Sequence, residues 1–238
     1  MTMEQRMDQL EKRNKRLTVA LTMMAMAAIT IQLSACGDDP AGPSTNCDVS
    51  DVGALAGRNL SECDLMGANL KDANLKGANL KGANLKNADL RYAILVDANL
   101  ENANLEGAIL VEANLKNANL SNANLEDANL EDANLEDANL WYANLEDARL
   151  GGAKLDGADL LEANLKDANL SNAILESADL SRADLSRADL SGANLRDANL
   201  KNARLGGAKL DGADLRGAID VPELSAKQEE DACRSDCR

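Results

Sequence analysis

The sequence predicts an all-β fold, a parallel β-solenoid in which the chain turns after every five residues. Two regularities predict it. Every fifth residue from position 55 to position 215 is leucine, and every fifth residue from position 68 to position 218 is alanine. Each alanine stands two positions before a leucine, and the residue between them is mostly Asn or Asp. The repeating unit is therefore Ala-(Asn/Asp)-Leu-x-x, where x is mainly charged, small or polar.

A period of five fits neither an α-helix nor a flat strand. Five residues advance an α-helix by about 500°, so successive leucines would spiral around it instead of forming one apolar face. In a strand, an odd step sends successive leucines to opposite faces. A chain that turns after each short extended stretch can point Leu and Ala inward together, because residues two apart share a face. Only a neighbouring coil can bury the open ends of such a coil, so the coils must stack.

The positions outside and between the buried residues have their own roles in this interpretation. The x-x pair lies on the outside of the coil, at its corners. The Asn or Asp between Ala and Leu is expected to hydrogen-bond local backbone at these corners. Alanine suits the interior because a larger side chain would not fit beside the leucines.

This pattern resembles the pentapeptide-repeat family over residues 59–218, about two-thirds of the chain. The resemblance implies a right-handed, four-sided parallel β-solenoid. It implies about eight coils of 20 residues and a rod roughly 40 Å long at the usual spacing between strands.

The composition excludes several functions. The chain has 238 residues, no histidine, no phenylalanine and a formal net charge of −15. Nucleic-acid binding through phosphates needs positive charge, so no nucleic-acid partner is expected. Without histidine, a Ser-His or Cys-His nucleophile pair cannot form. We expect no enzyme activity, no cofactor, no metal and no small-molecule substrate, since a convex rod also lacks the cleft in which acid–base catalysis takes place.

The first 35 residues have the character of an export signal. Basic residues precede an apolar run over residues 17–33, and the run ends in Leu-Ser-Ala-Cys. This ending resembles the lipobox of bacterial lipoproteins, which implies that Cys36 is lipidated and becomes the first residue of the mature chain. The alternative is an uncleaved N-terminal anchor. In either case the body is expected to be exported and held at a bacterial membrane, inner or outer, by a flexible linker over residues 36–46.

The rod geometry restricts how the remaining cysteines pair. Residues 47–62 form the expected N-terminal cap, residues 63–218 the solenoid, and residues 219–238 a tail with a short capping helix after Ser225. Cys47 and Cys63 fall at one end of the rod, whereas Cys233 and Cys237 fall at the other. A disulfide needs Cα atoms within about 7 Å, so the expected bonds are Cys47–Cys63 and Cys233–Cys237. A metal site at the last two is the alternative, disfavoured because no histidine is available.

Two surface features emerge if residues 20 apart are neighbours. The first is an acidic belt, in which like charges would repel and attract cations or a basic protein partner. Its residues are Glu106, Glu126, Asp127, Glu146, Asp147 and Asp167. The second is an apolar spot at Trp141, Tyr142 and Leu161, a candidate protein contact because interfaces are enriched in Trp and Tyr.

The sequence therefore predicts a non-enzymatic, monomeric structural or protein-interaction module, tethered to the lipid bilayer through acylated Cys36. The alternative is an acidic rod that imitates DNA and protects a topoisomerase such as DNA gyrase, as some pentapeptide-repeat proteins do. The export signal and the absence of phenylalanine, which is common at the central positions of that subgroup, disfavour the alternative.

Overall fold

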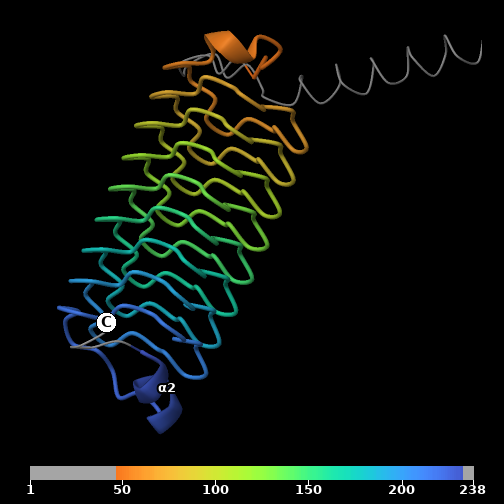
Figure 1. Ribbon diagram of the computed structural model, residues 1–238. Helices are drawn as coiled ribbons and strands as arrows, with labels where there is room; N and C mark the ends of the chain where they lie inside the picture. The colour runs from red at the N-terminus through yellow and green to blue at the C-terminus, as the bar shows by residue number, and fades with distance from the viewer. Residues whose placement is uncertain (1–46, 233–238) are drawn as a thin grey trace, which may run out of the picture.

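The computed structural model describes residues 47–232, and these form one continuous stack of coils (Figure 1). Parallel β-bridges join each middle residue to the residue 20 positions later, from Asn59↔Asn79 to Asn199↔Ile219. Each coil contains four such bridge positions, five residues apart, so the solenoid has four sides. The bridges confirm that residues 20 apart are stacked neighbours.

The interior is the leucine and alanine set that the period predicts. The repeat leucines and nearly all of the repeat alanines are buried, most of them with no exposed surface. Burying a leucine side chain contributes roughly 2 kcal/mol, and each coil buries four, so the stack is stabilised evenly along its length.

The backbone hydrogen bonds explain why the five-residue unit is stable. In residues 134–138, the Asn134 amide donates to the preceding coil, and the amides of Leu135 and Asp137 donate to the following coil. The Ala138 amide donates to the Leu135 carbonyl over 3.1 Å, which closes a β-turn. The remaining amide, that of Glu136, donates to the side-chain Oδ1 of Asn134 over 3.0 Å. Every amide of the unit therefore has an acceptor, and the Asn side chain supplies one of them, as predicted.

The N-terminal end is closed by the segment before the first full unit. It contains the short 3₁₀ helix η1 (Val52–Ala54), begun by Asp51, whose side chain accepts from the Gly53 amide. The Val52 carbonyl accepts from the Asn74 amide, which joins this segment to the first coil. A disulfide links Cys47 to Cys63, with their Cα atoms 5.6 Å apart and both residues buried.

The C-terminal end carries the helix α2 (Ala226–Asp231), which lies against the last coil (Figure 1). A capping box between Ser225 and Gln228 begins the helix. The Gln228 side chain is buried and donates to the carbonyls of Leu205 and Ala208, over 2.8 and 3.0 Å. The helix thus supplies donors to carbonyls of the final coil. Cys233 and Cys237 lie outside the described residues.

Candidate interaction surface

The corners of the coils present the variable residues, and their backbone conformation is unusual. The second corner residue of each unit has a φ near +60°, whether it is Gly or a residue such as Asp137 or Tyr142. Gly, Asn and Asp tolerate this left-handed conformation best, and they are the commonest residues at this position. The enrichment of Gly, Asn and Asp at every fifth position is the sequence signal for this left-handed conformation.

The acidic belt is partly neutralised, which corrects the expectation of an unbroken stack of like charges. Lys86 pairs with Glu106 over 2.8 Å, Lys166 pairs with Glu146, and Arg187 pairs with Asp167. In each pair the two residues are 20 positions apart in the sequence. The 20-residue register that stacks the acidic residues therefore also places basic residues beside them. Negative charge is therefore concentrated at the middle of the belt, at Glu126, Asp127 and Asp147.

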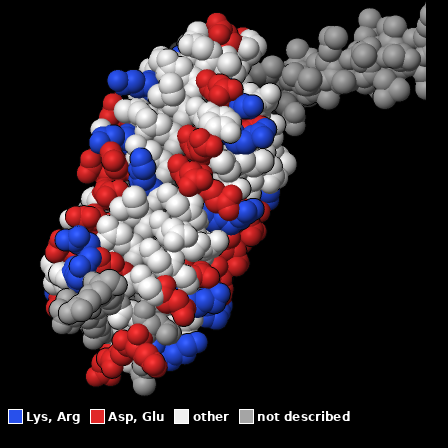
Figure 2. Space-filling model, viewed as in Figure 1, with Lys and Arg blue, Asp and Glu red and all other residues white. Residues whose placement is uncertain are grey.

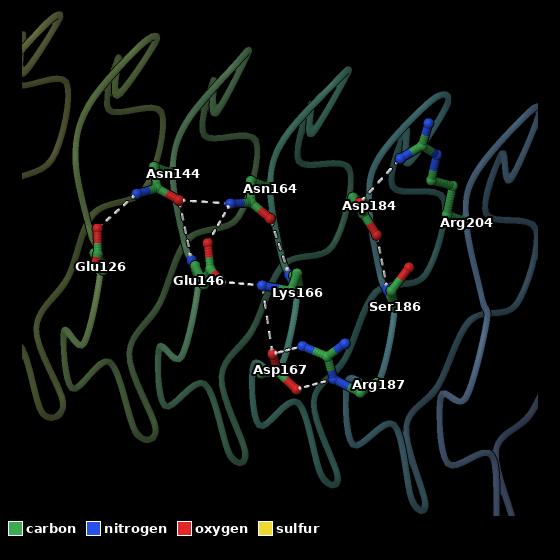
Figure 3. Close-up of polar contacts among 10 residues, drawn as sticks. All are labelled: Glu126, Asn144, Glu146, Asn164, Lys166, Asp167, Asp184, Ser186, Arg187 and Arg204. Carbon is green, nitrogen blue, oxygen red and sulfur yellow. Dashed lines mark hydrogen bonds and ion pairs between the residues drawn. The ribbon is translucent and has the colours of Figure 1, made fainter.

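The middle of the belt is joined to an asparagine ladder (Figure 3). Asn144 donates from Nδ2 to Asn124 over 3.1 Å and to Glu126 over 3.2 Å, and its Oδ1 accepts from Asn164 over 2.9 Å. Asn164 also donates to Glu146. The amide ladder thus fixes the carboxylates in place along the rod.

The paired carboxylates of the belt are not suited to proton transfer at neutral pH. The hydrogen bond from Lys166 lowers the pKa of Glu146, and the hydrogen bond from Arg187 lowers the pKa of Asp167. Both groups therefore remain charged. Over residues 47–232, no three acidic or cysteine side chains are arranged to hold a metal ion together.

The aromatic corner is exposed, and its relative exposure is 42% for Trp141 and 51% for Tyr142. Tyr142 has a φ of 55°, and its amide donates to the Leu161 carbonyl of the next coil over 3.0 Å. The structure therefore brings Trp141, Tyr142 and Leu161 to one corner. The corners before and after it on the same coil hold Glu-Asp pairs, at residues 136–137 and 146–147.

A second exposed apolar group was not predicted from the sequence. Tyr92 is exposed at the corner diagonally opposite the Trp141 corner, and Ile94 and Ile109 are exposed on the two sides of the solenoid that meet at this corner. The available signal was isoleucine at a position that normally holds Asn or Asp.

The hollows on the rod are shallow and lined by paired charges. One groove of about 550 Å³ is bordered by Lys166, Arg182 and Arg204, which pair with Glu146, Glu162 and Asp184 respectively. On the face in Figure 2, acidic and basic side chains lie close together in bands, with uncharged surface between them. The groove therefore offers no excess of charge to a small ion.

The predicted lipidation site, Cys36, lies outside the described residues. Within the described part of the chain, no helix has the length and apolar character needed to cross a membrane.

A match to one family model agrees with this architecture. The family model for pentapeptide repeats matches several overlapping segments between residues 54 and 217. No curated protein matches the chain. Among solved structures, HetL, a pentapeptide repeat protein involved in heterocyst differentiation regulation from the cyanobacterium Nostoc sp. strain PCC 7120, is 35% identical. The match covers 71% of this chain and 86% of HetL, with a TM-score of 0.33.

Two further solved structures are similar. QnrB1, a plasmid-mediated fluoroquinolone resistance protein, is 24% identical over 75% of this chain and 89% of its own, with a TM-score of 0.39. A pentapeptide repeat protein of the Arabidopsis thaliana thylakoid lumen is 30% identical over 54% of this chain and 79% of its own, with a TM-score of 0.18. The chain belongs to the pentapeptide-repeat family, whose members fold as right-handed quadrilateral β-helices and are structural or interaction proteins, not enzymes.

Proposed function

We propose that this protein is a non-enzymatic interaction module displayed at the surface of a bacterial membrane, to which acylated Cys36 tethers it. The observation that carries the interaction role is the separation of interior from corners. The interior is used entirely for stacking, whereas the corner residues differ from one unit to the next and point outward. Chemical variety is thus confined to a convex outer surface, which suits recognition of another macromolecule.

The tether is supported by the order of features before the body. A basic segment, an apolar run and Leu-Ser-Ala-Cys come first, and a polar linker rich in Gly, Pro and Asp follows. The disulfide between Cys47 and Cys63 suits an oxidising compartment outside the cytoplasm.

The partner that best fits the Trp141 corner is a basic protein. An exposed Trp and Tyr can stack on Arg or Lys side chains, a contact strengthened by nearby negative charge. Glu136 pairs with Lys116 and Glu146 pairs with Lys166, so the charge on the two adjacent corners comes mainly from Asp137 and Asp147. The side chain of Asp137 is 62% exposed. A basic segment crossing this corner would meet a carboxylate on either side of the rings.

The tether is tested by the intact mass of the protein purified from its native membrane fraction. We expect a chain that begins at Cys36 and carries added acyl mass. An unprocessed chain beginning at Met1 in the soluble fraction would refute the tether and would favour the topoisomerase-protecting alternative, which requires access to the cytoplasm.

The interaction surface is tested by cross-linking in the native membrane. Trp141→Ser combined with Tyr142→Asn should remove the cross-linked partner, and asparagine is compatible with the left-handed φ at position 142. The matched control is Asn122→Asp, at the equivalent corner position of the preceding coil, which changes a neighbouring corner residue without altering an aromatic ring. Retention of the partner by the double variant would refute the assignment of this corner.

A further inference from the structure

The turn at residues 91–92 carries an exposed apolar patch that no part of the proposed function uses. Tyr92 is 43% exposed, Ile94 is 42% exposed, and Ile109 on the next coil is 37% exposed. Val96 and Val111 are partly buried beside them. The Tyr92 amide donates to the Val111 carbonyl over 3.1 Å, which places the two coils of the patch side by side. We call these five residues the Tyr92 patch.

The Tyr92 patch departs from the repeating unit in ways that do not help the rod to fold. Ile94 and Ile109 occupy the middle position, where Asn or Asp normally accepts the amide of the first corner residue. Isoleucine has no side-chain oxygen, so the amides of Val96 and Val111 lose that acceptor. Tyr92 has a φ of 61°, which is unfavourable for an aromatic residue. Three departures at one corner indicate that the outer surface, not stacking, accounts for them.

Basic side chains border the patch on its N-terminal side. The Nζ atom of Lys71 lies 5.6 Å from the centre of the Tyr92 ring. Lys76 is at the next corner of the same coil, beside Val96 of the coil that follows. Arg91 pairs with Asp89 over 2.6 Å, and Asp72 is the second residue of the Lys71 corner. Long lysine stems can lie along apolar surface while their ammonium groups reach headgroup phosphates.

The position of the patch on the rod indicates what binds to it. The patch lies in the second and third coils from the N-terminal end, and Cys36 precedes Cys47 by a linker whose extended length is at most about 40 Å. A lipid-anchored body would therefore be held with these coils close to the bilayer, at a high effective concentration. A weak contact is then enough to orient the rod.

We propose that the Tyr92 patch is the surface by which the body rests on the lipid bilayer. Tyr92 and the isoleucines enter the boundary between headgroups and acyl chains, where aromatic and aliphatic side chains are favoured. Lys71 and Lys76 meet the headgroup phosphates. The diagonally opposite Trp141 corner then faces away from the membrane and is free to bind a protein. This inference rests on the proposed membrane tether.

The experiment replaces the lipid anchor, so that its outcome does not depend on whether Cys36 is acylated. The mature chain from residue 37 onward carries an N-terminal hexahistidine and is held on vesicles of phosphatidylcholine, phosphatidylglycerol and a nickel-chelating lipid. The chain has one tryptophan and no histidine, so the tether and the fluorescent probe are both unambiguous. Tyr92→Trp with Trp141→Phe reports on the patch, and the unsubstituted chain reports on the opposite corner.

Acyl-brominated lipids then measure which corner contacts the bilayer. We expect the Tyr92→Trp probe to lose roughly half of its emission as the patch enters the headgroup boundary, whereas Trp141 keeps its emission. Adding Ile94→Asn and Ile109→Asn restores the usual residue of the unit, so the fold is retained and the quenching should disappear.

Three results would overturn the proposal. They are an unquenched Tyr92→Trp probe, quenching that persists with both asparagines in place, and equal quenching of Trp141. If one of these results is obtained while the intact mass shows a lipidated Cys36, the proposed tether is retained and only the membrane contact of the Tyr92 patch is refuted.

Discussion

Two adjacent glycines at one corner should respond in opposite ways to alanine. Gly151 is a first corner residue without a positive φ, and a Cβ there would make ordinary contact with Ser171 Oγ at 3.6 Å. Gly152 is the second corner residue, with a φ of +69°, and a Cβ there would lie 2.3 Å from Asp132 Oδ1. The pair shares its coil, its exposure to solvent and its chemistry, so the two variants are matched controls for each other.

The size of the difference follows from the conformations. Gly151→Ala should raise the free energy of unfolding by about 0.4–1 kcal/mol, because alanine reduces the entropy of the unfolded chain without native strain. Gly152→Ala should lower it by roughly 1–2 kcal/mol, the usual cost of the left-handed conformation for a residue with a Cβ. Displacement of the Asp132 side chain adds to that cost.

Urea unfolding followed by circular dichroism measures both variants against the unsubstituted protein. Gly152→Asn is the rescue variant, since asparagine tolerates the left-handed region and already occupies this position at several other corners, such as Asn172 and Asn202. Equal effects of the two alanines, or a Gly152→Ala protein as stable as the original, would refute the assignment of the second corner residue as the conformationally restricted one.

Three other predictions concern the ladder, the cap and the ion pairs. Asn144→Ala should lower the free energy of unfolding by about 1–3 kcal/mol, because it removes the acceptor of the Glu146 amide and one ladder hydrogen bond each from Asn124 and Asn164; Ile174→Ala, at the same position of the unit, measures the loss of packing alone. Cys63→Ala with Cys47→Ser should cost about 3 kcal/mol, since the bond closes a loop with a sequence separation of 16; a chemically reduced protein as stable as the oxidised one in urea would contradict this. Arg187 lowers the pKa of Asp167 in the folded state. The ion pair therefore stabilises the folded protein fully above the ordinary pKa of aspartate, about 4. This stabilisation is lost as pH falls through the lower pKa of the folded state. Thermal unfolding of the original protein and of its Arg187→Gln variant should therefore differ at pH 7, and this difference should shrink as pH falls below about 4. A difference that is independent of pH would show that the pair does not stabilise through its charge.

The buried core of the solenoid could be predicted from the sequence because the leucines and alanines that form it recur with a constant period. A leucine or alanine at every fifth position admits few chain paths, and the resemblance to a four-sided family fixed the register of 20 residues. The Ser225 and Gln228 capping box was recognisable because it depends only on residues three apart.

The surface was harder to predict because it depends on relations between coils. Asp167 looks like a bare acid until Arg187, 20 residues later, is placed beside it. The register of 20 residues that stacks the acids also places Lys86, Lys166 and Arg187 beside them, so these pairs follow from the same spacing. Gly151 and Gly152 are identical in the sequence, yet only Gly152 has a positive φ, because the backbone conformation differs between the first and the second corner position.

The departures from the repeating unit are the most informative residues of the surface. A repeat whose backbone amides are satisfied by the unit itself can change its corner residues at little cost to the neighbouring coils. Random change would scatter exposed apolar residues along the rod. Instead, most of those on the described coils gather at two diagonally opposite corners, around Tyr92 and around Trp141. Because both tyrosines are also held at a positive φ, each corner combines a conformational cost with exposed apolar area. Opposite placement then allows the two corners to contact different partners at once, which one continuous patch of the same area could not do.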